Sequence, residues 1–206
     1  MKLGVVCCKV LETEMKRAVA DRPEISEMKV MEWGLHIQPD LLAESVSCAI
    51  RDMADKVDAV VLGYGRCQAM DRLHDDLPVP VFRPDGEDCI GVLLGQDRYE
   101  KELYTVAGTW FLTPGWTEMG IESVFSELQL RRLEDRGIEP LAMAKRMLDG
   151  YTRTLLIEIP GTPESEALVL KQKALEITDS LGLKLEKTCG SLAQLNKTLD
   201  QALSSG

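Results

Sequence analysis

Three of the six cysteines in this 206-residue chain stand where a buried strand is expected to end or the next helix to begin. Cys8 closes LGVVCC, Cys67 follows AVVLGYGR, and Cys89 follows VPVFRPDGED. Parallel strands of an open α/β sheet end at one edge, and ligands bind in the crevice there. We therefore predict that these three cysteines meet at one site, with Cys189, which follows LKLEKT, as a candidate fourth member.

Thiolates at such a site would bind a metal. Zinc is the first expectation and an iron–sulfur cluster the alternative, because both are held by cysteine sulfur. Two other interpretations stay open. The cysteines are unconnected buried thiols, or Cys89 is a metal-free nucleophile whose pKa is lowered at a helix N-terminus. Spacing alone does not choose between them, because no two cysteines form a local CxxC pair.

Polar and aromatic residues near these cysteines complete the predicted site. Tyr64 and Gly65 lie in the turn after a strand, and with Trp116, beyond a Pro-Gly turn, they are candidate cofactor-binding residues. Arg66 and Glu87 are candidate catalytic residues, since a carboxylate beside the site carries protons or binds a cation. The chain has no GxGxxG and no GxxxxGK[ST], which excludes a Rossmann dinucleotide site and a P-loop.

The elements that would position these residues alternate between strand and helix, which predicts an α/β fold with a mainly parallel sheet and helices on both faces. We predict one domain over residues 1–206, with lobes of similar winding at 1–107 and 108–206 and a helical insert near 118–150. Asp85 or Asp88 is expected to cap a helix over 88–103, and Thr162 to cap a helix over 162–182. Expected strands cover 2–8, 28–34, 57–65, 79–84, 108–116, 153–160 and 183–188, and further helices cover 9–20, 41–56, 68–74 and 191–203.

Composition excludes several classes of protein. A net charge of −10 argues against a nucleic-acid-binding surface, and no apolar run approaches the roughly 20 residues that span a bilayer. The apolar run at the N-terminus is too short for a signal peptide. We expect a cytoplasmic protein, in which six cysteines are not a disulfide framework because cytosolic thiols stay reduced.

Several segments also resemble a known family. LGYGRC, DCIGVLLGQDRY and GTWFLTPGW, in that order, with Cys8 in CKVLETEM and the late CGSLAQLNKTL, are similar to an uncharacterised bacterial and archaeal family of unknown function. That family is associated with corrinoid-dependent methyltransferase systems, and its pattern also places cysteine at Cys8, Cys67 and Cys89. One departure is Glu87, which stands where the family usually has histidine before Asp-Cys.

The resemblance implies a metal-binding protein of one-carbon or corrinoid methyl transfer. Its partner would be a small-molecule substrate or a methyltransferase or corrinoid protein. The alternative is a non-enzymatic accessory protein that delivers a metal or a corrinoid to a methyltransferase. The resemblance therefore does not decide whether the protein is an enzyme. The chain lacks the DxHxxG pattern of corrinoid carriers, which argues that it is not the carrier itself.

Overall fold

The structure, a computed structural model, describes residues 1–73 and 76–206. The chain divides into two compact units: unit 1 comprises Met1–Gln96 and Ser191–Gly206, and unit 2 comprises Asp97–Gly190. Each unit contains its own parallel sheet with helices around it, which confirms the predicted α/β class. The lobes at 1–107 and 108–206 stay a prediction, and the two units are described one at a time.

Unit 1 has a four-stranded parallel sheet in the order β2-β1-β3-β4. The strands are β1 (Leu3–Cys8), β2 (Ile25–Met31), β3 (Ala59–Gly63) and β4 (Val81–Phe82). Every residue of β1 and β3 is buried, as expected for central strands covered on both faces. Cys7 pairs with Gly63 in the register of these two strands, so β1 and β3 end level with each other.

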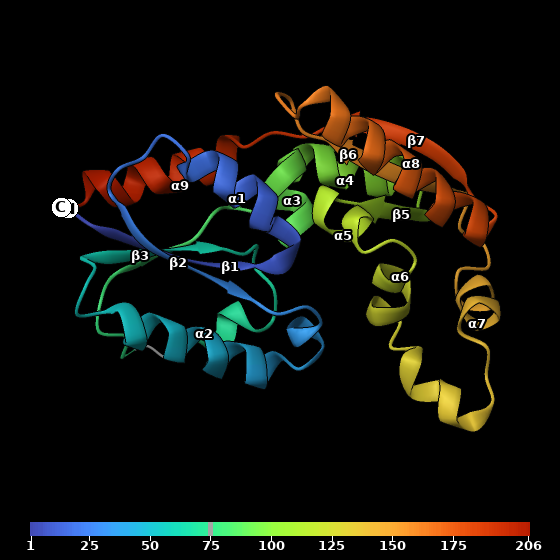
Figure 1. Cartoon of the computed structure of the whole chain (residues 1–206), viewed down its shortest axis with the longest axis horizontal. Helices are drawn as coiled ribbons and strands as arrows, with labels where there is room; N and C mark the ends of the chain where they lie inside the picture. The colour runs from blue at the N-terminus through green and yellow to red at the C-terminus, as the bar shows by residue number, and fades with distance from the viewer. Residues whose placement is uncertain (74–75) are drawn as a thin grey trace. The chain divides into compact units, whose positions relative to one another are not determined.

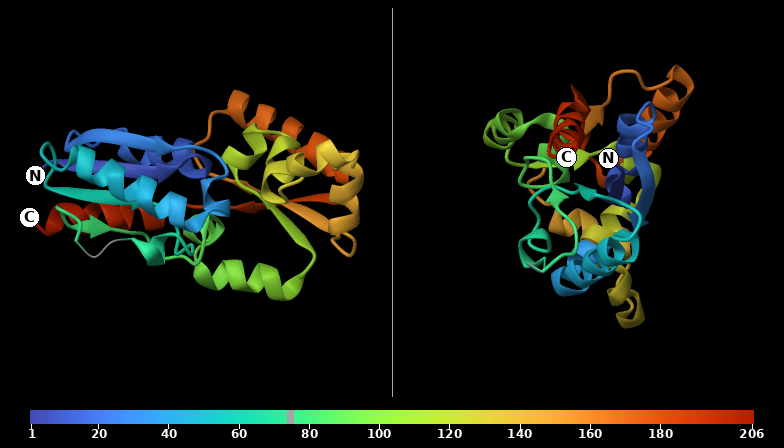
Figure 2. Two further views of the ribbon diagram at one scale, coloured as in Figure 1. Left: turned by 90° about the horizontal axis from the view of Figure 1, so that it is seen from below. Right: turned by 90° about the vertical axis from the view of Figure 1, so that its left-hand side faces the viewer.

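Helices cover both faces of this sheet. In Figure 1, α2 (Pro39–Met53) lies on one face, and α1 (Glu12–Val19) and α9 (Ala193–Ser204) lie on the other. Leu195, Leu199 and Ala202 of α9 are fully buried, a helical spacing that turns one stripe toward the sheet. The first and last residues lie side by side in unit 1 (Figure 2): a Cβ built on Gly206 would stand 2.7 Å from the Met1 sulfur.

Unit 2 has a three-stranded parallel sheet in the order β5-β6-β7, formed by β5 (Thr109–Leu112), β6 (Arg153–Glu158) and β7 (Lys184–Cys189). The helix α8 (Glu164–Leu181) packs on one face, with Leu112, Leu156 and Ile177 in a shared core. The opposite face meets α4 (Gln96–Thr105), where the Tyr99 ring contacts Phe111 edge-on at 5.4 Å. The predicted insert near 118–150 consists of α6 (Glu122–Glu127), a 3-10 segment (Arg131–Arg136) and α7 (Pro140–Met147) and follows α5 (Pro114–Glu118).

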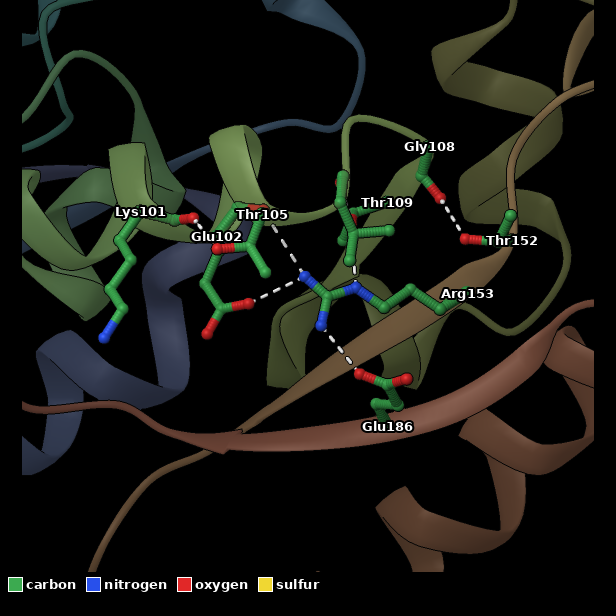
Figure 3. A network of polar contacts seen from close by, with 9 residues as sticks. Lys101, Glu102, Thr105, Gly108, Thr109, Thr152, Arg153 and Glu186 are labelled. Carbon is green, nitrogen blue, oxygen red and sulfur yellow. Dashed lines mark hydrogen bonds and ion pairs between the residues drawn. The ribbon is translucent and has the colours of Figure 1, made fainter.

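A buried arginine on β6 contacts three other elements of unit 2 (Figure 3). Arg153, at the start of β6, is 6% exposed, and its Nε donates to the Thr109 hydroxyl at 2.8 Å. Its Nη1 donates to Glu186 on β7 and its Nη2 to Glu102 on α4, each at 2.7 Å. Hydrogen bonds to charged groups are stronger than neutral ones, so this network fixes how α4, β5 and β7 meet β6.

The helix predicted over 88–103 is wrong in its extent. It forms two helices, α3 (Cys89–Leu94) and α4, because Gly95 adopts a left-handed φ of 79° that ends α3. The predicted cap is confirmed at Asp88, whose carboxylate accepts hydrogen bonds from Ile90 N–H and Gly91 N–H at 2.8 Å.

Other predicted boundaries also shift. Thr162 does not cap α8, because its hydroxyl donates to the Ile159 carbonyl at 2.7 Å and the N-cap residue is Pro163. The strand over 79–84 keeps only Val81–Phe82, since Pro80 and Pro84 have no N–H to donate to a sheet. The helix over 68–74 is a 3-10 turn at Met70–Arg72, and its predicted last residue, His74, lies outside the described residues.

No helix within 1–73 and 76–206 combines the length and apolar character that a membrane span needs.

Candidate functional site

Two of the three predicted thiol ligands are in direct contact in unit 1. Cys8 ends β1, Cys89 begins α3, and the two side chains share a hydrogen bond that favours the protonated Cys89 thiol as its donor. The backbone N–H of Gly65, in the loop after β3, donates to the Cys89 sulfur. The end of β1, the loop after β3 and the start of α3 therefore converge at one edge of the sheet.

Two glycines allow this convergence. A Cβ at Gly63 would stand 2.4 Å from the Cβ of Cys7, and a Cβ at Gly65 would stand 2.3 Å from the carbonyl carbon of Asp88. The two loops are also joined directly, since Arg66 N–H donates to the Gly86 carbonyl at 2.6 Å. Any side chain at position 65 would force the two loop backbones apart.

Tyr64 lies between these two glycines, where the thiols gather. It is 2% exposed, and its hydroxyl has no hydrogen-bond partner within the part of the chain that the structure describes. The pKa of the phenol is raised, first by burial and then by the charges that Cys8, Cys7, Cys89 and Cys67 would carry. Thiols from β1, from the loop after β3 and from α3 are therefore all within electrostatic reach of one buried hydroxyl. We call Cys7, Cys8, Cys67 and Cys89 the thiol cluster.

The thiol cluster does not have the geometry of a formed metal site. Among residues 1–73 and 76–206, no group of three or more histidine, cysteine, aspartate or glutamate side chains is arranged to hold an ion. Cys67 is half-buried in its loop, and the fourth candidate, Cys189, is exposed at the end of β7 in unit 2. The joint role of Cys8, Cys67 and Cys89 as metal ligands stays a prediction.

The remaining predicted site residues lie in different surroundings. Gly65 is buried, whereas the side chains of Arg66 and Glu87 are exposed. The main chain of Glu87 donates to the side chain of Gln96 at 3.3 Å. Trp116 is half-buried on α5 in unit 2, where its N–H donates to the Thr113 hydroxyl at 3.2 Å. The catalytic roles of Arg66 and Glu87 and the ligand-binding role of Trp116 stay predictions.

Two further buried groups, Cys7 of the thiol cluster and Glu14 on α1, have no role predicted from the sequence. Cys7 is fully buried, and its pKa is raised first by burial and then by Cys8 and nearby carboxylates, including that of Glu14. Glu14 itself is only 1% exposed. The burial of Glu14 could have been predicted from helical spacing. Glu14 follows Leu11 by three residues and precedes Ala18 by four, which places it on the buried stripe of α1.

The expectation that a helix N-terminus lowers the pKa of Cys89 is wrong. The helix α3 has only six residues, and the Asp88 carboxylate already accepts from its first free N–H groups. The pKa of Cys89 is raised well above its ordinary value, first by the hydrogen bond with Cys8 and second by burial of the sulfur. At neutral pH this thiol is protonated, which argues against a metal-free nucleophile there.

The raised pKa of Cys89 leads to a labelling prediction for the reduced protein treated with a chelator. At pH 7 we expect iodoacetamide to alkylate Cys89 at least about tenfold more slowly than the exposed Cys189, because the thiolate is the reacting species and only its fraction reacts. Since the pKa of Cys89 is raised, its alkylation rate should keep rising with pH after the rate of an ordinary thiol has levelled off. Peptide mass spectrometry of a timed series checks this. Preferential labelling of Cys89 at pH 7 would restore the nucleophile interpretation.

Comparison with known proteins adds a family but no activity. A search of curated proteins found no match, and neither did a search of solved structures. A family model described as "Protein of unknown function (DUF1638)" matches residues 30–199. The match spans Tyr64, Cys67 and Cys89, while Cys8 lies before it. The resemblance to an uncharacterised family is thereby confirmed, and its link to corrinoid systems stays a prediction. Because the match covers most of its length, the chain belongs to the DUF1638 family of proteins of unknown function.

Proposed function

We propose that unit 1 is a metal-binding module that holds a zinc ion through Cys8 and Cys89, with Cys67 as the third ligand. The observation that carries the proposal is the contact between Cys8 and Cys89, two residues far apart in sequence, at the carboxyl edge of a parallel sheet. Ligands of open α/β sheets bind at this edge. Zinc is commonly held by cysteine sulfur, and catalytic zinc sites use three protein ligands.

The electrostatics of the thiol cluster suit a cation. Burial and neighbouring groups raise the pKa values of Cys7, Cys89 and Tyr64, so the cluster disfavours negative charge when no cation is present. A divalent ion reverses this balance, because it replaces thiol protons and neutralises the sulfurs that lose them. Zinc affinity should therefore fall as pH decreases, since binding releases protons.

We assign the third ligand to the loop after β3. Cys67 is half-buried there, and its N–H donates to the Gly65 carbonyl at 2.9 Å. The loop is anchored beside Cys89 through Gly65 and Arg66, so its main chain already lies next to the pair. Metal binding that orders its own ligands is common in proteins, and here it would draw one side chain inward.

We further propose that the module acts in methyl transfer to a thiol. A bound zinc ion would keep a coordinated thiol deprotonated and so able to accept a methyl group. This extension is supported by the resemblance of three segments to a family associated with corrinoid-dependent methyltransferases. Methyl transfer from methylcobalamin to 2-mercaptoethanol, followed by its absorbance change, tests the extension separately from metal binding.

Metal content tests the zinc site directly. The untagged protein is purified without oxygen, and its metals are measured together with its visible spectrum. We expect about one zinc ion per chain and no colour, and near-complete loss of zinc in the Cys8→Ser and Cys89→Ser variants. Cys67→Ser should also lose most of the zinc, since the same three-ligand site loses one of its thiolates.

A matched control comes from Cys48, an exposed cysteine on α2 whose thiol contacts Glu44. Cys48→Ser should retain the full zinc content. If the purified protein is brown and contains iron and sulfide, the group held by these cysteines is an iron–sulfur cluster, and the zinc assignment is wrong. A protein that binds no metal after reconstitution, or a Cys89→Ser variant with unchanged zinc, would refute the proposal.

A further inference from the structure

Unit 2 contains a pocket at the carboxyl edge of its own sheet. The pocket has a volume of about 240 Å³ and is formed by the end of β6, the loop that follows β6, the first residue of α5 and the first two turns of α8. Ligands of open α/β sheets bind at this edge. The pocket is therefore a candidate binding site, and it shares no residue with the thiol cluster of unit 1.

Most of the pocket wall is apolar and buried. Leu156, Ile157, Ile159 and Leu170 line it, and none of them is more than 7% exposed. At about 30 Å³ for each water-sized group, the volume holds up to about eight heavy atoms. Pockets for drug-sized ligands start at about 300 Å³. The pocket therefore suits a small molecule with a short aliphatic chain.

The polar side chains of the pocket are acceptors. Among the described residues that line it, only Glu158 and Thr162 have polar side chains. The Glu158 carboxylate is 47% exposed, and one of its oxygens accepts from Lys187 on β7. The Thr162 hydroxyl already donates to the Ile159 carbonyl at 2.7 Å, so it can only accept from a ligand. A ligand that donates hydrogen bonds therefore suits the pocket better than one that accepts them.

The charges at the pocket favour a cation. Its lining, within residues 1–73 and 76–206, includes no lysine, arginine or histidine, and Glu158 is its one ionisable side chain. The positive end of the α8 dipole would attract an anion, but the first turn of α8 already carries Glu164 and Glu166. A hydrogen bond from an ammonium group to a carboxylate is also about twice as strong as a neutral one.

We propose that this pocket binds a small aliphatic amine, whose chain packs against Leu156, Ile159 and Leu170 and whose ammonium group donates to Glu158. Lys187 and the amine then compete for the same carboxylate, which moderates the affinity. The amine site does not rest on the proposed zinc site, because the two use residues of different units.

Methyl NMR of the full chain tests the amine site. Protein labelled at its isoleucine and leucine methyl groups is titrated at pH 7 with pentylamine, pentanol and pentanoate, which share one chain and differ in the polar end. We expect saturable shifts of the Ile157, Ile159 and Leu170 signals, with pentylamine binding at least about tenfold more tightly than pentanoate. Butylamine should bind about fourfold more weakly than pentylamine, since one buried CH₂ is lost.

Substitutions locate the binding. Ala167→Leu fills the pocket and should weaken pentylamine by about tenfold or more. Ser165→Leu places the same side chain at an exposed position of α8 outside the lining and should change nothing. Glu158→Gln should reduce the affinity for pentylamine to about that for pentanol. Lys187→Met should tighten pentylamine, because Glu158 loses its competing cation.

Two sets of results would overturn the proposal. If pentanoate binds as tightly as pentylamine, or if Glu158→Gln leaves the affinity for pentylamine unchanged, the ligand is not an amine held by Glu158. If none of the three compounds gives saturable shifts, or if a folded Ala167→Leu protein binds pentylamine like the wild type, the pocket is not the site. Circular dichroism checks folding, and should Ala167→Leu unfold, the exposed Glu158→Gln position decides. The zinc content of the protein affects none of these outcomes.

Discussion

Replacing Arg153 with methionine is expected to lower the free energy of unfolding of unit 2 by about 3 kcal/mol, because two carboxylates lose their partner. Arg153 is buried and donates to Glu102, Glu186 and Thr109. The side chain of Glu102 is 23% exposed, so water cannot fully replace the arginine there. The side chain of Glu186 is 51% exposed and contributes less, since solvent reaches it.

Denaturation followed by tryptophan fluorescence measures this loss. Two of the three tryptophans, Trp110 and Trp116, lie in unit 2, so a Trp33→Phe background isolates its signal. Lys187→Met is the matched control, because Lys187 on β7 pairs with Glu158 at the surface and its loss should change stability by less than about 1 kcal/mol. Equal effects of the two substitutions would mean that the buried network adds nothing beyond an exposed ion pair.

Gly65→Ala is expected to destabilise unit 1 by about 3 kcal/mol and to separate the thiols. A Cβ at this position would stand 2.3 Å from the carbonyl carbon and oxygen of Asp88, and main-chain atoms cannot turn away as a side chain can. The shift would also weaken the Gly65 N–H contact with the Cys89 sulfur. Thermal unfolding by circular dichroism and the alkylation rate of Cys89 at pH 7 should therefore change together.

Gly4→Ala separates this effect from the general cost of a larger residue. A Cβ at Gly4 would come within 2.4 Å of the Met53 sulfur, which is part of a flexible side chain that can rotate away. We expect a loss of about 1 kcal/mol and an unchanged Cys89 alkylation rate. If both alanine variants behave alike, close contact between the two loops is not what holds the thiols together.

The α/β class was predictable because it follows from the pattern of apolar residues. The runs at β1 and β3 are continuous, which is typical of strands buried on both faces, and both are buried along their whole length. The break between α3 and α4 was missed because periodicity continues across Gly95, and the positive φ of this glycine ends the helix. The loss of a cap at Thr162 was missed for a similar reason, since its hydroxyl has a carbonyl of its own loop within reach.

The site was predictable only where strand ends determine position. Cys8 and Cys89 meet because β1 and the segment after β4 finish at the same edge of one sheet. The side chain of Cys67 belongs to a loop, and loop conformation depends on contacts such as that of Gly65 with Asp88, which no periodicity encodes. Tyr64 was predicted as a ligand contact, but the sequence does not show that its hydroxyl is buried without a hydrogen-bond partner among residues 1–73 and 76–206.

The return of α9 to unit 1 has a consequence for synthesis on the ribosome. All of Asp97–Gly190 is translated before the helix that covers β3 and β4, so unit 2 has its complete sequence first. Until α9 emerges, the surface that buries Leu195 and Leu199 in the folded protein is open to solvent. Domains usually fold in the order of their synthesis. Here unit 1 begins first but cannot complete its fold until α9 has been synthesised. Its uncovered sheet is the part of the nascent chain that a chaperone would protect.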